Sequence, residues 1–128
     1  MNKILIIEDE VDLRDTIAAI LTISDFDVCT AHDGKSGIDM VMKENPDLII
    51  CDVNMPVMSG FDVLINLKSK FTENDMPLFL FLTASVQEDD IAKGMKLGAN
   101  DYIMKPFDVD GLISAINKNL ERSALIKK

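Results

Sequence analysis

A chain of 128 residues is long enough to bury one hydrophobic core, and its 48% hydrophobic and 27% charged residues exclude disorder over most of its length. Its formal net charge of -9 repels nucleic-acid phosphates and anionic lipid headgroups, which argues against direct binding to nucleic acid or a membrane surface. The apolar runs are far shorter than the roughly 18 residues that span a bilayer, and the first is too short for a signal peptide. We therefore expect a single cytoplasmic domain.

Short, nearly continuous runs of Ile, Leu, Val and Phe predict five strands buried on both faces. Apolar residues at intervals of three and four predict five amphipathic helices between and after these runs. In chain order, the predicted elements are strand Lys3–Ile7, helix Val11–Ile23, strand Asp27–Ala31, helix Gly34–Lys43, strand Leu48–Cys51, helix Gly60–Lys70, strand Leu78–Leu82, helix Val86–Leu97, strand Tyr102–Met104 and helix Val109–Ala124.

Residues that begin or end helices mark several of these boundaries. Pro46 and the restricted residue before it stop the second helix. Ser59 and Asp108 are suited to cap the N-termini of the third and fifth helices. The fourth helix is the weakest, because Gly94 in its interior costs about 1 kcal/mol relative to alanine. We expect that helix to be mobile.

The alternation of strands and helices indicates right-handed crossovers and a parallel sheet covered on both faces. We expect a doubly wound α/β fold, a flavodoxin-like (βα)5 sandwich whose five-stranded parallel sheet has the order 2-1-3-4-5. The domain should cover residues 1–124, followed by a short tail over 125–128. The sequence predicts no second domain.

Functional groups of an open α/β sheet lie beyond the carboxyl ends of its strands. Glu8 and Asp9 follow the first strand and Asp52 follows the third, so the expected strand order gathers three acids. Unit charges about 4 Å apart interact by roughly 4 kcal/mol at an effective dielectric of 20, so such a cluster calls for a cation. Oxygen ligands select a hard ion, and we expect Mg²⁺.

Several separated motifs occur in an order and spacing that resemble the receiver domain of two-component response regulators, in its single-domain, chemotaxis-regulator-like form. The resemblance covers nearly the whole chain. The motifs that carry it are Glu8-Asp9, Asp52, Met55-Pro56-Val57-Met58-Ser59-Gly60, Leu82-Thr83-Ala84, Gly98-Ala99-Asn100-Asp101-Tyr102 and Lys105-Pro106-Phe107.

The resemblance implies that Asp52 is the phosphoacceptor, whose carboxylate attacks phosphorus to give an acyl phosphate. It further implies that Asp9, Asp52 and the backbone carbonyl of Asn54 bind Mg²⁺, while Glu8 acts through a water molecule. Glu8, Asp9, Asp52 and Lys105 together carry a net charge of -2, which one Mg²⁺ would neutralise.

Further roles follow from the same resemblance. Lys105 would reach in from a neighbouring strand and neutralise a phosphoryl oxygen, with a cis peptide bond to Pro106 aiming it inward. From the sequence alone, a trans bond is the more frequent form. Thr83 would contact the phosphoryl group through its hydroxyl. Tyr102 matches the switching aromatic, which turns inward as the Thr83 hydroxyl moves.

The implied partners are a histidine kinase or histidine phosphotransfer protein as donor, docking along the first helix, and a downstream target protein. We expect the target on the fourth helix, fifth strand and fifth helix, where Lys93, Lys96, Lys118 and Tyr102 form a candidate exposed surface. The sequence favours a stand-alone receiver over one excised from a longer regulator or hybrid kinase, and does not name the pathway.

Three other functions are known for related sheets, and the residues argue against each. A phosphatase forming an aspartyl phosphate would carry Asp-x-Asp after the first strand, where this chain has Glu8-Asp9-Glu10. A flavin carrier would need a Ser/Thr/Gly loop there to hold the FMN phosphate. A receiver that has lost phosphorylation would lack matched positions. We expect a signalling domain, not an enzyme, that catalyses only its own phosphorylation and dephosphorylation.

Cysteine, histidine and methionine residues suggest no further site. Cys29 and Cys51 lie in apolar segments without C-x-x-C spacing, so we expect two buried thiols. The single histidine, His32, follows the second strand at the sheet edge, and we expect it on the surface and not as a phosphoacceptor. The eight methionines are spread over several elements, which is typical of core filling.

Overall fold

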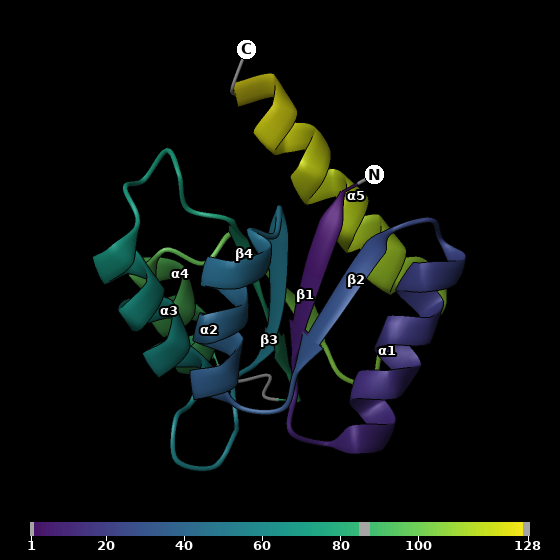
Figure 1. Cartoon of the computed structure of the whole chain (residues 1–128), viewed down its shortest axis with the longest axis horizontal. Coiled ribbons are helices and arrows are strands. Elements are labelled where there is room, and N and C mark those ends of the chain that lie inside the picture. The colour runs from purple at the N-terminus through teal and green to yellow at the C-terminus, as the bar shows by residue number, and fades with distance from the viewer. Residues whose placement is uncertain (1, 85–87, 127–128) are drawn as a thin grey trace.

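Strands and helices alternate along residues 2–84 and 88–126, which the computed structural model describes (Figure 1). The five strands form one parallel sheet of order β2-β1-β3-β4-β5, which confirms the predicted doubly wound fold. The elements are β1 (Lys3–Ile7), α1 (Val11–Ile23), β2 (Asp27–Ala31), α2 (Gly34–Glu44), β3 (Leu48–Asp52), α3 (Gly60–Lys70), β4 (Leu78–Thr83), α4 (Glu88–Leu97), β5 (Asp101–Met104) and α5 (Val109–Ile126).

Most predicted boundaries agree with the structure, and the differences are small. β3 and β4 each extend by one residue, so Asp52 and Thr83 belong to the strands rather than following them. β5 begins one residue earlier than predicted, α2 ends one residue later, and α5 continues two residues further, to Ile126. The predicted start of the fourth helix at Val86 lies outside the described residues.

Capping side chains define the helix ends that the sequence predicted. Ser59 accepts a hydrogen bond from the backbone N–H of Asp62, whose carboxylate accepts one from the N–H of Ser59, so α3 begins with a reciprocal capping box. Asp108 accepts a hydrogen bond from the N–H of Gly111 at the start of α5. Asn45 takes a left-handed conformation, with φ of 50°, and ends α2 before Pro46.

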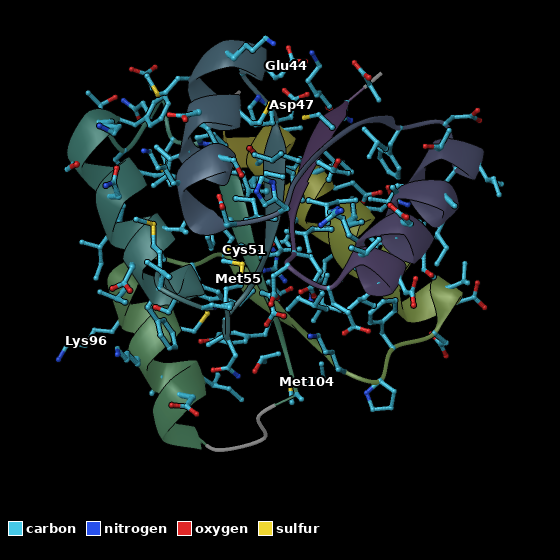
Figure 2. All side chains as sticks on the ribbon, turned by 60° about the horizontal axis from the view of Figure 1, so that its bottom comes forward. Glu44, Asp47, Cys51, Met55, Lys96 and Met104 are labelled. Carbon is cyan, nitrogen blue, oxygen red and sulfur yellow. The ribbon has the colours of Figure 1, made fainter. Side chains whose placement is uncertain are left out.

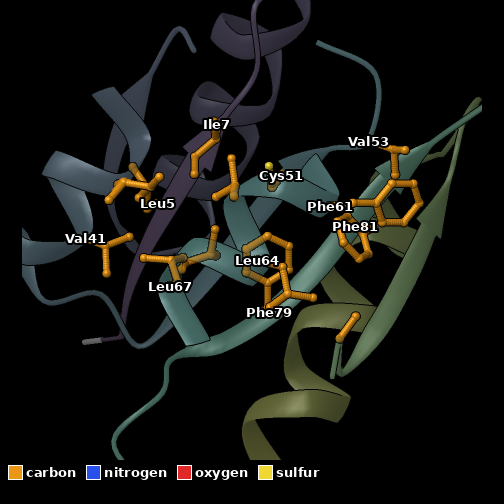
Figure 3. Close-up of a cluster of buried hydrophobic side chains, with 14 of the residues drawn as sticks. Leu5, Ile7, Val41, Cys51, Val53, Phe61, Leu64, Leu67, Phe79 and Phe81 are labelled. Carbon is orange, nitrogen blue, oxygen red and sulfur yellow. The ribbon is translucent and has the colours of Figure 1, made fainter. Parts of the chain in front are cut away.

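The sheet separates two cores that differ in composition. On the side of α1 and α5, the buried strand residues are aliphatic, and we call this side the aliphatic face; they are Ile4, Ile6, Leu48, Ile50, Leu80, Leu82 and Ile103. On the side of α2, α3 and α4 lies the aromatic face, where Phe79 and Phe81 of β4 pack with Phe61 of α3 (Figures 1 and 3). Alternation along each strand sends successive side chains to opposite faces.

The outer strands β2 and β5 form the two edges of the sheet. Because β2 lies at an edge, Cys29 is only partly buried, so the expectation of two buried thiols is wrong for this residue and correct for Cys51. His32 follows β2 with a side chain 70% exposed, as expected. Asp27 of β2 is exposed and lies 3.8 Å from the ammonium of Lys3. Among the described residues, no helix is long and apolar enough to cross a membrane.

Candidate functional site

Three carboxylates meet where β1 and β3 end. These strands pair in parallel with Ile7 opposite Cys51, so Glu8 after β1 comes close to Asp52 of β3. One carboxylate oxygen from each of Glu8, Asp9 and Asp52 lies within 4.8 Å of the others. Figure 2 looks toward this end of the sheet, near the labelled Cys51 and Met55. The three acids lie together, as the predicted strand order requires.

Burial distinguishes the three acids. Glu8 is 1% and Asp52 is 5% exposed, whereas Asp9 is exposed to solvent. Burial, followed by hydrogen bonding to Asp52 and repulsion from its charge, raises the pKa of Glu8 to about 8. The protonated form of Glu8 is therefore favoured more than it is for an exposed glutamate.

Lys105 contacts both buried acids. Its Nζ lies 3.0 Å from Oδ2 of Asp52 and 3.4 Å from Oε1 of Glu8. Burial would lower the pKa of Lys105, but hydrogen bonding to Asp52 and the charges of Asp52 and Glu8 outweigh it, so the pKa is raised. The peptide bond between Lys105 and Pro106 is cis. Because β4 lies between β3 and β5, Lys105 reaches across one strand, not from a neighbouring strand as expected.

Backbone groups also hold the loops that surround Asp52. The N–H of Asn54 donates to Oδ1 of Asp52 at 3.0 Å. The N–H of Gly60 donates to the carbonyl of Val53 at 2.9 Å. A Cβ on Gly60 would collide with the backbone carbonyl of Asp52 and lie 3.0 Å from Cα of Val53. Glycine therefore lets the first turn of α3 pack directly against the strand that carries Asp52.

Arg14 of α1 is a site residue that the sequence analysis missed. Its guanidinium donates to the backbone carbonyl of Glu8 at 3.0 Å and so holds the loop between β1 and α1. A cation near the N-terminus of a helix opposes the helix dipole. This unfavourable position was a signal in the sequence that Arg14 has another partner.

Thr83 and Tyr102 lie on the β4–β5 side of the cluster. Thr83, at the end of β4, is 1% exposed, and its carbonyl accepts a hydrogen bond from the N–H of Lys105 at 2.8 Å. Tyr102 is half-buried rather than exposed, and its hydroxyl donates to the backbone carbonyl of Asp90 in α4 at 2.8 Å. Its ring lies 5.4 Å from the ring of Phe81, measured between centroids. Tyr102 therefore contacts both the aromatic face and α4.

The three lysines expected on the target surface differ in their surroundings. Nζ of Lys93 lies 4.5 Å from the ring centroid of Phe61, so its charge is directed toward α3. Lys118 forms an ion pair with Asp101 at 3.1 Å, although its side chain is half exposed. Lys96 is exposed on α4, and its labelled side chain points away from the body of the molecule (Figure 2). The expected positive surface is therefore less continuous than the sequence suggested.

Comparisons with known proteins agree with this geometry. The family model of the response regulator receiver domain matches residues 4–117. A response regulator receiver domain protein from Clostridium thermocellum is 31% identical, with a TM-score of 0.89 over 98% of this chain and 99% of the other. Chemotaxis protein CheY4 of Vibrio cholerae is 29% identical, with a TM-score of 0.86 over 92% and 98% of the two chains.

A third similar structure, NtrX from Brucella abortus, is 28% identical, with a TM-score of 0.89. The match covers 98% of this chain but 28% of the NtrX chain, so the same fold also occurs as part of a longer protein. The strand order, the acidic cluster and the family match over most of the sequence lead to one conclusion: this chain belongs to the response regulator receiver domain family.

Proposed function

We propose that this receiver domain accepts a phosphoryl group on Asp52 and changes conformation to control a partner protein. The observation that carries the proposal is the buried carboxylate of Asp52, which lies 3.0 Å from the ammonium of Lys105 and beside two further acids. A carboxylate oxygen of Asp52 attacks phosphorus, the P–N bond of a donor phosphohistidine breaks, and the imidazole leaves with a proton from solvent.

Two groups beside Asp52 assist this transfer in our proposal. Lys105 exchanges part of its contact with Asp52 for a phosphoryl oxygen, and its charge stabilises the added negative charge. The hydroxyl of Thr83 contacts a second phosphoryl oxygen from the end of β4, the strand next to β3. A movement of Thr83 alters the contact between Tyr102 and α4, and so the surface formed by α4 and β5.

The acidic cluster fits a magnesium site, because its donors are all oxygens. Asp9, Asp52 and the backbone carbonyl of Asn54 would hold the ion, with Glu8 contacting it through a water molecule. Bound Mg²⁺ supplies the positive charge that screens these carboxylates from the incoming phosphoryl oxygens. The geometry supports this fit, since one carboxylate oxygen from each of the three acids lies within 4.8 Å of the others.

The proposed donor is a histidine kinase or a histidine phosphotransfer protein that docks along α1, close to the open side of the cluster near Asp9. The proposed target binds the surface of α4, β5 and α5, which lies on the Tyr102 and Lys105 side of the site. In this proposal the domain catalyses only its own phosphorylation and dephosphorylation and has no further substrate.

Incubation with acetyl phosphate and Mg²⁺, followed by intact-mass spectrometry, tests the proposal. We expect one added phosphoryl group, none in Asp52→Asn, and wild-type behaviour in the control Asp39→Asn, which makes the same chemical change on the exposed side of α2. Asp9→Asn should lower both Mg²⁺ affinity, measured by calorimetry, and the rate of phosphorylation. A metal-independent phosphoryl group of equal yield on Asp52→Asn would refute the assignment.

A further inference from the structure

Gly94 of α4 lies directly against Tyr102. A Cβ built on Gly94 would collide with the Tyr102 hydroxyl and lie 2.9 Å from Cζ of the same ring and 2.8 Å from Cε2 of Phe81. The hydroxyl occupies this space because it donates to the carbonyl of Asp90, one helical turn earlier in α4. We infer that Gly94 is a positioning residue, which allows the Tyr102 ring to lie beneath α4 and whose replacement would expel the ring.

The attachments of α4 show why the ring, rather than the helix, would move. Nζ of Lys68 in α3 donates to the carbonyl of Leu97 at 2.9 Å and so holds the C-terminal end of α4. Lys93 of α4 lies above the ring of Phe61, which is also in α3. Two contacts therefore fix α4 against α3, whereas the Tyr102 hydroxyl is the far end of a side chain that can rotate about χ1.

Gly94 has a role in packing that its low helix propensity does not reveal. By propensity alone, glycine weakens the fourth helix, because it loses more conformational freedom than alanine on helix formation. The structure shows that Gly94 is buried and that no Cβ fits at its position without displacing an aromatic ring. Gly94 lowers the intrinsic stability of the helix, and in return it leaves the space in which the Tyr102 hydroxyl lies.

One consequence rests on the proposed function, in which Tyr102 is the switching aromatic. If Tyr102 already lies beneath α4 in the unphosphorylated chain, phosphorylation at Asp52 has little further effect on the position of the ring. A target that recognises this arrangement then binds part of the unphosphorylated population. In Gly94→Ala the new methyl group opposes the position of the Tyr102 ring beneath α4. That position then becomes dependent on phosphorylation.

The composition of the chain makes this inference directly measurable. Tyr102 is the single tyrosine and there is no tryptophan, so 3-fluorotyrosine gives one ¹⁹F resonance and the phenol absorbance titrates one group. Burial, together with the negative charge of Asp90, raises the pKa of Tyr102 above its ordinary value. In the wild type we expect a raised phenol pKa, a ¹⁹F shift distinct from that of free fluorotyrosine, and little change in this shift after acetyl phosphate and Mg²⁺ are added.

Gly94→Ala and the control Lys96→Ala distinguish the effect of a methyl group beside Tyr102 from the effect of placing alanine on α4. Both variants place alanine on this helix, but Lys96 is exposed. We expect Gly94→Ala to move the ¹⁹F resonance toward the free value and the phenol pKa toward its ordinary value, and Lys96→Ala to leave both unchanged. If both signals in a folded Gly94→Ala equal those of the wild type, the inference is wrong. If Gly94→Ala fails to fold, the wild type decides, because a solvent-like resonance there also overturns the inference.

These measurements use the unphosphorylated protein and so are independent of the proposed function. A chain whose Asp52 accepts no phosphoryl group would still show the effect of Gly94→Ala on Tyr102. A chain that is phosphorylated normally, with no effect of Gly94→Ala on Tyr102, would retain the proposed function and lose this inference.

Discussion

The two faces of the sheet bury similar strands but use different side chains. The buried residues of the aliphatic face are all branched aliphatic side chains from the sheet, α1 and α5. Among its buried residues, the aromatic face adds Phe61, Phe79, Phe81 and Met55 to branched aliphatic side chains. Aromatic rings and methionines can repack by rotation or flexing, whereas interlocked branched side chains have few alternative rotamers. The aliphatic face is therefore suited to hold a site, and the aromatic face is suited to transmit a change.

The proposed site follows this division. Glu8 continues the alternation of Ile4 and Ile6 in β1. Asp52 continues that of Leu48 and Ile50 in β3, so both acids lie on the side of the aliphatic face. Thr83 continues the alternation of Phe79 and Phe81 in β4, on the aromatic face. The two buried acids thus lie on the aliphatic face, whereas Thr83, which we propose contacts the phosphoryl group, lies on the aromatic face.

The largest expected effect compares one residue from each face of β4. Leu80→Ala should lower the free energy of unfolding by about 2–5 kcal/mol, because it leaves a cavity among fully buried aliphatic side chains, and it should leave the Tyr102 ¹⁹F resonance in place. Phe81→Leu should lower the free energy of unfolding by roughly 1–2 kcal/mol. It should also move the Tyr102 ¹⁹F resonance, since Phe81 contacts the Tyr102 ring. Urea denaturation and ¹⁹F spectra check both. Equal shifts of the resonance would remove the distinction between the faces.

A smaller effect concerns Glu8 at the end of the aliphatic face. Its pKa in the folded protein, about 8, exceeds the ordinary value of 4.5, so between these values the folded state binds more protons than the unfolded state. In the presence of EDTA, the free energy of unfolding should therefore fall as pH rises from about 5 to 8, by at most about 1.4 kcal/mol per pH unit. The slope should vanish in Glu8→Gln and persist in Asp39→Asn. A slope that survives in Glu8→Gln would assign it to another group.

The smallest effect tests the outer side of the aromatic face. Lys93→Gln should lower the free energy of unfolding by about 0.5–1 kcal/mol, because it removes the cation above Phe61. Lys96→Gln changes an exposed lysine on the same helix and should have no measurable effect. Chemical denaturation of the two variants side by side gives the comparison. If both variants lose equal stability, the contact of Lys93 with Phe61 contributes nothing specific.

The fold and the acidic cluster followed from the sequence because their signals are local. Short runs of branched residues define the buried strands, and Ser59 and Asp108 mark helix starts through hydrogen bonds to residues three positions away. Once the strand order is known, Glu8 and Asp52 must lie together, since parallel strands end at the same edge.

Contacts between distant elements could not be predicted in this way. The space that Gly94 leaves for Tyr102 depends on how α4 packs over β5, and the direction of Lys93 depends on the position of α3. The partial exposure of Cys29 follows from the edge position of β2, and an apolar run does not reveal whether a strand is outermost. The raised pKa of Glu8 likewise depends on its burial and on Asp52 of β3, which lies far from it in the sequence.

The two outer strands also bear on how the protein behaves at high concentration. An outer strand offers backbone groups that can pair with another molecule and start β-aggregation. β2 carries the exposed charge of Asp27, and β5 has four residues and is followed by Lys105 and Pro106, the second of which has no N–H to donate. Charge on one edge and proline beside the other discourage sheet extension, so the domain can expose both edges without joining its neighbours through them.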